Sequence, residues 1–329
     1  MSAMTADKEK AANPLAGFVP VQVRTLRSTK VDSCDLFVQY EPQCEPVLYS
    51  RAGSHPEEQQ FAELAEAGVE NLYVRSGDFG NLSKELLESL ESILKRDDMR
   101  RSDKFATLQL AVAVAIEQTL RLTDCSKFRE LATKVGGDLV TVLGDGDVLP
   151  RELFRMARHD FNAFTHVTNV AGYNVVLARQ MGITDDNELR KIATAAILHD
   201  IGKRFIPARI LTKTERLNTE EREMVESHPT RGYAELYEKS DLEYGQLMMV
   251  YQHHERMDGA GYPVGVVKDE IHPWARMLAV VDVFDTMTAK RPEGRPATAE
   301  QVLEFQRQQA GTQFDREVVE CWISAMTKT

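Results

Sequence analysis

The sequence predicts an α+β N-terminal domain followed by an all-α helical bundle. A chain of 329 residues is long enough for about two domains of ~150 residues each. Over the first 95 or so residues, short apolar runs are separated by turn residues, which is typical of strands. From Asp97 onwards, apolar residues recur with helical spacing. We therefore expect an α+β domain over 1–97, a helical connector over 98–150 and a helical domain over 151–329.

The N-terminal domain is predicted to contain short strands and two helices. Strands rich in Val, Phe, Tyr and Leu are expected at 18–23, 35–40, 46–50 and 71–75. One helix is expected at 56–67, because Gly68 can end it, and a second is expected at 83–95, where leucines repeat at helical spacing. We find no catalytic constellation in this domain.

The rest of the chain is predicted to be helical, with breaks at Gly144–Gly146 and at Gly182. The first two helices could form a dimerising connector, but their apolar faces fit packing within the chain equally well. The helices are expected at 101–122, 126–143, 150–158, 161–181, 186–200, 219–237, 242–254, 273–289, 298–309 and 315–326.

Charge and hydropathy exclude several classes of protein. The net charge is −11, and no basic stripe of the kind that binds a nucleic-acid polymer is visible. The longest strongly apolar run, Leu110–Ile116, is far shorter than the ~20 residues of a membrane span. The N-terminus lacks an apolar signal segment, so we expect a cytoplasmic protein. The cysteines are scattered and predict neither a disulfide framework nor a zinc site: Cys34, Cys44, Cys125 and Cys321.

An adjacent His–Asp pair lies at the end of the 186–200 helix. His199 and Asp200 are followed by Gly202, which can end or bend a helix. An imidazole beside a carboxylate suits a divalent transition metal, because a carboxylate has two oxygens and can bridge a pair of ions. Taken alone, the pair is more commonly a surface dipeptide.

A second cluster follows in Tyr251–Pro263. Adjacent side chains on a helix diverge by about 100°, so His253 and His254 reach one site only near a helix end or across two ions. Pro263 favours an extended backbone at Tyr262, whose ring could hydrogen-bond or stack on a substrate. The alternative is an aromatic plug in a surface turn.

Three further residues complete a candidate ligand set. His166 lies on an apolar helix face, where a satisfied core histidine is the common alternative, and His228 ends a helical stretch. Asp282 interrupts an apolar helix, and a metal ion would supply the partner that a buried carboxylate needs. The ligand groups recur every 25–33 residues, so successive helices of a bundle could point them inwards. Ligation by His and carboxylate without thiolate favours iron or manganese over structural zinc.

These residues resemble the HD-GYP family, bacterial phosphodiesterases of the HD superfamily that hydrolyse cyclic di-GMP. The resemblance covers about 151–327, and the motifs that carry it are His199-Asp200-Ile-Gly-Lys203, His253-His254-Glu-Arg-Met-Asp258-Gly-Ala-Gly261-Tyr262-Pro263, Asp282-Val-Phe-Asp285 and Arg291-Pro292. It implies an HD-type helical bundle with two divalent ions, iron or manganese. It also implies hydrolysis of cyclic di-GMP to pGpG by a hydroxide that bridges the metals, with further hydrolysis to GMP left open.

The resemblance also implies roles for individual residues. Asp200 would bridge the two ions, and Lys203 would sit against the scissile phosphate, so both are the expected catalytic residues. Asp258, Gly261, Tyr262 and Arg291 would contact the substrate together with Lys203. The implied metal ligands are His166, His199, Asp200, His228, His253, His254 and Asp282. The leading α+β segment is similar to the regulatory modules that precede such domains.

Two departures from the family pattern bear on function. Members that bind three metals carry Glu four residues before the first His, and this chain has Asn162 there, so we expect two metals. Arg291-Pro292 is followed by Glu293 and Gly294, where the family often has a Tyr and a basic residue, which leaves substrate affinity open. The alternatives are a catalytically slow or silent module that binds cyclic di-GMP, and a hydrolase of another phosphorylated nucleotide. A homodimer or a signalling protein partner is compatible with either.

Overall fold

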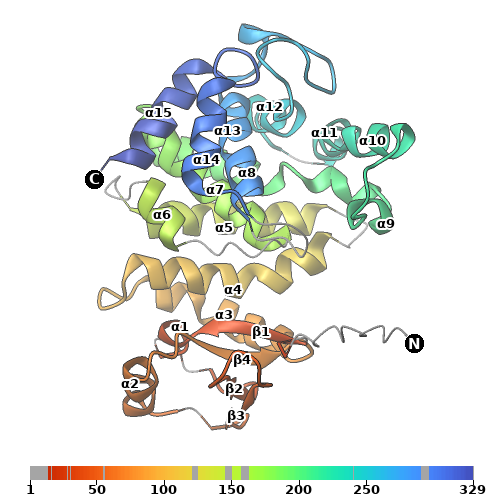
Figure 1. Cartoon of the computed structure of the whole chain (residues 1–329). Helices are drawn as coiled ribbons and strands as arrows, with labels where there is room; N and C mark the ends of the chain where they lie inside the picture. Colours follow the sequence, from red (N-terminus) through yellow and green to blue (C-terminus); the bar gives the residue numbers. More distant parts are fainter. Residues whose placement is uncertain are drawn as a thin grey trace, which may run out of the picture. The chain divides into compact units, whose positions relative to one another are not determined.

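The computed structural model divides the chain into two compact units, Met1–Ser89 and Leu90–Thr329 (Figure 1). No helix among the described residues is long and apolar enough to cross a membrane. The described residues are 14–15, 17–27, 29, 31–54, 56–120, 125–144, 150–156, 163–239, 241–289 and 296–328.

The first unit is built on a four-stranded antiparallel sheet, in the order β1-β4-β2-β3. In β4 the buried side chains of Leu72 and Val74 alternate with more exposed neighbours, so one face of the strand packs inwards. The predicted strands are confirmed, whereas the five residues of α1 are too few to show a helical period. The elements are β1 (Phe18–Gln22), α1 (Val23–Arg27), β2 (Leu36–Val38), β3 (Val47–Ser50), α2 (Glu58–Glu66), β4 (Asn71–Arg75) and the start of α3 (Phe79–Leu94).

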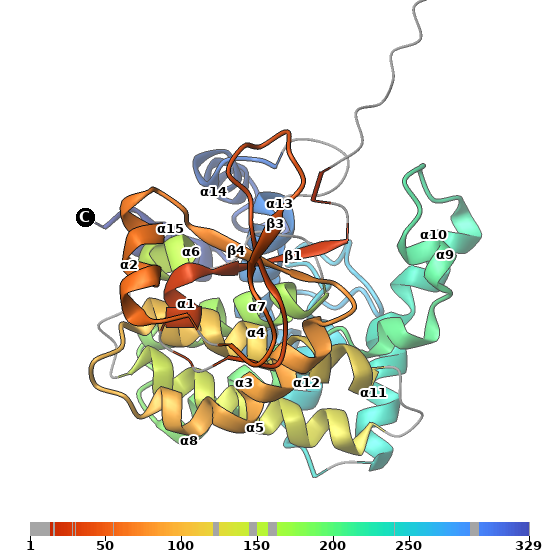
Figure 2. The same ribbon diagram turned by 90° about the horizontal axis from the view of Figure 1, so that it is seen from below.

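The second unit is helical, so the predicted fold class is confirmed. Figure 2 shows α9 and α10 projecting from the other helices of this unit. Short elements with too few residues for a periodic pattern were not predicted, namely η1, α9 and η2. The elements are α4 (Arg101–Leu120), α5 (Ser126–Leu143), α6 (Pro150–Met156), α7 (Ala163–Gln180), α8 (Asp186–Leu198), η1 (Ile201–Phe205), α9 (Ala208–Leu211), α10 (Thr219–Glu226), α11 (His228–Lys239), α12 (Tyr244–Gln252), η2 (Lys268–Glu270), α13 (Pro273–Thr288), α14 (Ala299–Gln308) and α15 (Arg316–Thr327).

The single helix predicted over 219–237 is wrong, because the chain forms two helices there. α10 ends at Glu226, and α11 begins at His228. Pro229 has no backbone N–H and is tolerated only in the first turn of a helix, so it marks a new start. His228 therefore opens a helix instead of ending one.

Buried aromatic rings hold the long helices of the second unit together. Tyr173 of α7, Phe284 of α13 and Trp322 of α15 are fully buried and meet edge-on, with centroid separations of 5.1–5.9 Å. Edge-to-face pairs of this kind contribute about 0.5–1.5 kcal/mol each beyond their buried area. They fix α7 and α13 against each other, and both helices carry polar residues further along.

A glycine lets η1 approach α11 closely. A Cβ atom on Gly202 would lie 1.9 Å from the carbonyl oxygen of His228 and 2.8 Å from the backbone nitrogen of Gly232. Backbone atoms cannot move aside as a flexible side chain can. Glycine is therefore required at 202, and the contact brings Asp200 within 3.3 Å of His228.

We expect Gly202→Ala to lower the free energy of unfolding by at least about 2–3 kcal/mol, because the methyl group overlaps the backbone of α11. Urea denaturation of the full chain measures the change. Gly80→Ala is the matched control, since a Cβ there meets nothing within 4 Å and Ala favours the helix. Equal stability of the two variants would show that η1 can shift away at no cost.

Candidate metal centre

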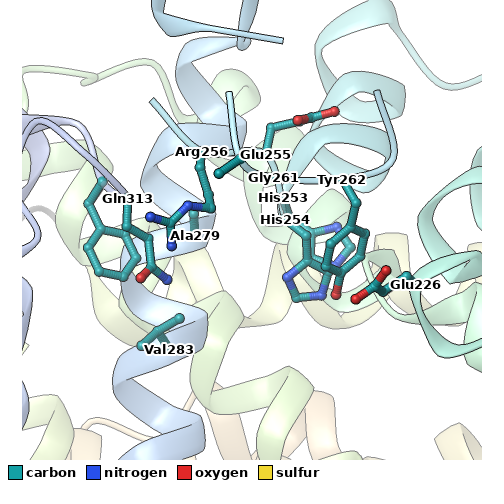
Figure 3. A pocket seen from close by; sticks show the side chains of 12 residues that line it. Glu226, His253, His254, Glu255, Arg256, Gly261, Tyr262, Ala279, Val283 and Gln313 are labelled. Carbon is teal, nitrogen blue, oxygen red and sulfur yellow. The ribbon is translucent and has the colours of Figure 1, made fainter. Parts of the chain in front are cut away.

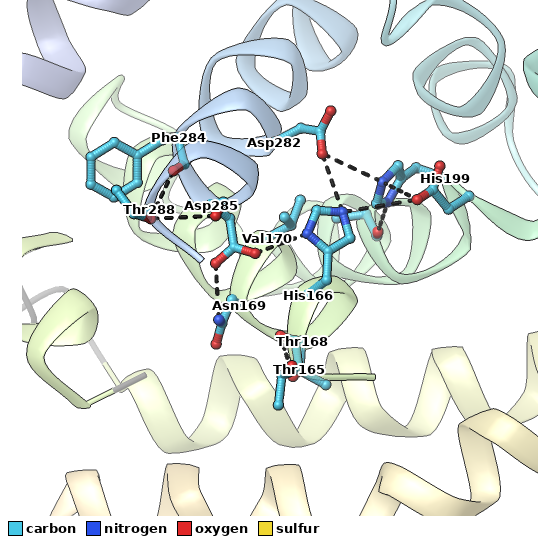
Figure 4. Close-up of polar contacts among 12 residues, drawn as sticks. Thr165, His166, Thr168, Asn169, Val170, His199, Asp282, Phe284, Asp285 and Thr288 are labelled. Carbon is cyan, nitrogen blue, oxygen red and sulfur yellow. Dashed lines mark hydrogen bonds and ion pairs between the residues drawn. The ribbon is translucent and has the colours of Figure 1, made fainter. Parts of the chain in front are cut away.

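The helical unit gathers all the histidines and aspartates that the resemblance implied as ligands. Figure 4 shows three of them, His166, His199 and Asp282. They form two groups around Asp200, and within each group the possible ligand atoms lie within 4.8 Å of one another. The first group is His166, His199 and Asp200, with Asp282 beside it, and the second is His228, His253 and His254.

The orientation of three of these histidines is fixed by the local backbone. In each, Nδ1 faces a carbonyl oxygen three residues earlier. Because a carbonyl can only accept, Nδ1 carries the proton, and the lone pair of Nε2 is directed into the site. The pairs are His199 with Ala196 at 2.6 Å, His228 with Val225 at 2.7 Å and His253 with Val250 at 2.8 Å.

The second histidine group is built for a cation. The Nε2 atoms of His228 and His253 lie 3.2 Å apart, and neither carries a proton that could join them. Burial lowers the pKa of His253 well below its ordinary value and lowers the pKa of His254 to about 3, so both rings are neutral. Converging lone pairs on neutral imidazoles are the donors that a divalent transition metal takes.

Asp200 divides its two oxygens between the groups. Oδ1 lies 3.3 Å from Nε2 of His228, and Oδ2 lies 3.4 Å from Nε2 of His199. Oδ1 is buried and has no hydrogen-bond donor among the described residues. Nε2 of His199 is also buried and has no hydrogen-bond partner among them. Burial alone would raise the pKa of Asp200, but His199 and Lys203 hold it well below its ordinary value. These unpartnered atoms and this donor set fit a pair of metal ions.

His166 is held by two side chains of α13. Its Nε2 lies 3.2 Å from Asp282, and its Nδ1 lies 2.8 Å from Oδ2 of Asp285. Burial lowers the pKa of His166, but the hydrogen bonds to the two carboxylates outweigh it and raise the pKa to about 10. The sequence motif includes Asp285, but its contact with His166 was not predicted. The signal was its spacing of three residues from Asp282, which places both on one helix face.

Lys203 and Tyr262 flank the two groups. Nζ of Lys203 lies 2.5 Å from Oδ2 of Asp200. The Tyr262 ring lies 4.7 Å from the ring of His254, and its backbone N–H donates to the His254 carbonyl. Burial raises the pKa of Tyr262 above its ordinary value, so its hydroxyl stays protonated.

The loop that carries Tyr262 is fixed by residues that sequence reasoning missed or assigned otherwise. The buried carboxylate of Glu255 accepts hydrogen bonds from the backbone N–H groups of Val264 and Gly265. A Cβ on Gly261 would lie 2.5 Å from the backbone nitrogen of Arg256, so the turn needs glycine there. The position of Glu255 directly after the histidine pair was the available signal.

A cavity of about 270 Å³ opens beside His254 and Tyr262 (Figure 3). Arg256 and Gln313 point into it, and apolar Ala279, Val283 and Phe314 line its walls. Asp258 is not among the lining residues. Its carboxylate accepts two hydrogen bonds from Arg256, at 3.0 and 2.7 Å, and the Arg256 hydrogen bonds lower its pKa to about 2. The predicted substrate residue Arg291 lies outside the described residues, as does Asn162.

Comparison with known proteins identifies the family to which this half of the chain is similar. The family described as HD domain matches residues 151–318. A cyclic di-GMP phosphodiesterase response regulator of Xanthomonas campestris is 38% identical over 47% of this chain and 40% of its own length. A cyclic di-GMP phosphodiesterase of Pseudomonas aeruginosa is 33% identical over 53% of this chain and 42% of its own length. A 3'3'-cGAMP-specific phosphodiesterase of Vibrio cholerae is 34% identical over 46% of this chain and 33% of its own length. The chain thus spans less than half the length of these relatives.

One solved structure shares the fold over almost the whole chain. It is Bd1817, described as an HDG"Y"P protein from Bdellovibrio bacteriovorus, with a TM-score of 0.62 at 15% identity. The alignment covers 94% of this chain and 100% of that one. The family match spans just over half of the chain and includes His199 and Asp200. The chain therefore belongs to the HD domain family, and the resemblance to the HD-GYP proteins drawn from its sequence is confirmed.

Proposed function

We propose that the chain is a metal-dependent phosphodiesterase that hydrolyses cyclic di-GMP to pGpG at a site holding two divalent ions, iron or manganese. The observation that carries the proposal is the division of the Asp200 oxygens between two groups of imidazoles. His166, His199 and Asp282 would hold one ion with Asp200, and His228, His253 and His254 would hold the other. The names of the relatives support the substrate class.

A pair of bound divalent ions would supply Lewis acidity to a phosphate and an activated water. The chain's own residues do the rest. The ammonium group of Lys203 is only partly exposed beside Asp200, where it can stabilise negative charge on a phosphate oxygen. The hydroxyl of Tyr262 stays protonated, so it can donate a hydrogen bond to the substrate. The Glu255 carboxylate holds the loop that presents this hydroxyl.

The cavity beside Tyr262 suits a guanine base. Its apolar walls would cover the faces of a purine, and Arg256 stands at its edge. A guanidinium can only donate hydrogen bonds, and guanine offers the acceptors O6 and N7. Adenine keeps N7 but has an amino group where guanine has O6, so one donor of Arg256 would be left without an acceptor. This preference supports cyclic di-GMP, and hydrolysis of 3'3'-cGAMP remains the second candidate because three relatives carry that name.

The direct test is an assay of the full chain loaded anaerobically with iron or manganese. Cyclic di-GMP, 3'3'-cGAMP and cyclic di-AMP are supplied separately, and the products are separated by chromatography. We expect cyclic di-GMP to give pGpG. Tight binding of cyclic di-GMP without hydrolysis would favour the silent binding module, and hydrolysis of none with binding of none would overturn the proposal.

Asp200→Asn keeps the shape of the side chain but removes its charge and one anionic oxygen. We expect the wild-type protein to hold two ions per chain by elemental analysis. The variant should hold one at most and lose at least ~100-fold of its hydrolysis rate. Asp269→Asn, on a fully exposed side chain, is the control. A variant that keeps both ions and its activity would contradict the bridging role, and three ions in the wild type would contradict the stoichiometry drawn from Asn162.

Arg256→Met keeps the apolar stem of the side chain and removes its donors. We expect kcat/KM for cyclic di-GMP to fall about 10- to 100-fold, since a good pair of hydrogen bonds to a base gives about 1–3 kcal/mol of discrimination. The kcat/KM for cyclic di-AMP and the metal content should not change. Arg307→Met, which removes an exposed arginine paired with Glu304, is the control. An equal loss for all three dinucleotides would show that Arg256 does not recognise the base.

A further inference from the structure

A buried glutamine of α4 reaches towards the metal centre from outside the segment that the HD domain family matches. Gln109 is fully buried, and α4 precedes residue 151, where the family match begins. Nε2 of Gln109 lies 2.7 Å from Oδ1 of Asn169 and 3.1 Å from the hydroxyl oxygen of Thr168, both on α7. The amide of Gln109 therefore contacts α7 one turn away from His166.

The contact continues through buried side chains to the imidazole of His166 (Figure 4). Nδ2 of Asn169 donates to Oδ1 of Asp285 at 2.9 Å, and Oδ2 of Asp285 accepts from Nδ1 of His166 at 2.8 Å. Gln109, Asn169, Asp285 and His166 are each less than 9% exposed. A continuous hydrogen-bond network thus runs from α4 through α7 and α13 to one candidate ligand.

The direction of each hydrogen bond between Gln109 and His166 is fixed by chemistry. The carboxylate of Asp285 only accepts, so Asn169 must turn its nitrogen towards Asp285 and its oxygen towards Gln109. Gln109 must then donate to that oxygen. At the other end, Asp285 requires a proton on Nδ1 of His166, which directs Nε2 towards Asp200 and Asp282.

The buried amide of Gln109 has hydrogen-bond partners at its nitrogen only, among the described residues. Oε1 of Gln109 is buried and has no hydrogen-bond partner among the described residues. A buried acceptor without a partner costs about 1–3 kcal/mol, and this cost is tolerated at Gln109. The amide is explained by its donor end, which holds the oxygen of Asn169.

We propose that Gln109 is a positioning residue for His166, acting through Asn169 and Asp285 on the ion that His166 would hold. The inference rests on the proposed metal centre. Without the donor of Gln109, the amide of Asn169 can rotate and release Oδ1 of Asp285. The carboxylate is then free to turn, and His166 loses its fixed orientation. The group of His228, His253 and His254 takes no part in this hydrogen-bond network and keeps its geometry.

The test is a calorimetric titration of Mn²⁺ into the metal-free full chain, which needs no substrate and no turnover. We expect Gln109→Met to weaken Mn²⁺ binding at one of the two sites by about 3- to 10-fold. Replacing a group in direct contact with a ligand costs about 10- to 100-fold, and Gln109 lies further away. The second site should bind as in the wild type.

Gln306→Met is the matched control. Gln306 is also fully buried, its Nε2 donates to the carbonyl of Val280 at 2.7 Å, and its Oε1 has no partner among the described residues. Urea denaturation of the metal-free proteins should show comparable changes in stability for the two variants. Only Gln109→Met should change Mn²⁺ affinity, and equal effects on affinity would overturn the proposal by making the loss a general consequence of a damaged core.

A double-mutant cycle tests the path. In an Asp285→Asn background, Gln109→Met should have no further effect on Mn²⁺ affinity, because the link that it acts through is already lost. Gln109→Glu covers the case in which the Met variant does not fold. It keeps the shape but presents acceptors to Asn169, so affinity should again fall at the same site.

Failure of the positioning role and failure of the proposed metal centre give different results. Wild-type affinity in Gln109→Met, or additive effects in the cycle, would overturn the positioning role while leaving the metal centre intact. A wild-type chain that binds no Mn²⁺ would instead overturn the proposed metal centre, and the positioning role with it.

Discussion

The site depends on one largely buried carboxylate that lies between two groups of imidazoles. Asp200 is ionised although its side chain is only 14% exposed, and its oxygens face His228 on one side and His199 on the other. A largely buried charge is costly unless cations or hydrogen-bond donors surround it. The surrounding structure is therefore arranged for positive charge to be held between these groups, with Lys203 as the ammonium at its edge.

Backbone geometry brings the groups this close. Asp200 follows the end of α8, and His228 opens α11, so both come from short connections between helices. The two segments meet because Gly202 has no side chain to separate η1 from the His228 carbonyl. The loop of Tyr262 is fixed in the same way, by the missing side chain of Gly261 and by the Glu255 carboxylate. Close approach at glycine thus places residues that are distant in sequence beside one another.

The sequence predicted what depends on local pattern. The spacing of apolar residues predicted the long helices, and the strands of the first unit followed from short β-rich runs. It did not predict the break between α10 and α11, because the helical period continues across Ser227 and only Pro229 marks the restart. The partners of His166 were also out of reach, since Asp285 and Gln109 lie 119 and 57 positions from it and no local pattern links them.

The different support given to His166 follows from where the histidines lie on their helices. His199, His228 and His253 each follow the last turn of a helix, where carbonyl oxygens have no intrahelical partner and can accept from Nδ1. His166 lies within α7, where backbone carbonyl oxygens accept from the N–H four residues later. The acceptor for its Nδ1 proton comes from another helix. Asp285 is that acceptor, and a carboxylate with two oxygens then needs a donor for its second oxygen. Asn169 supplies it, and the amide oxygen of Asn169 in turn requires the donor of Gln109.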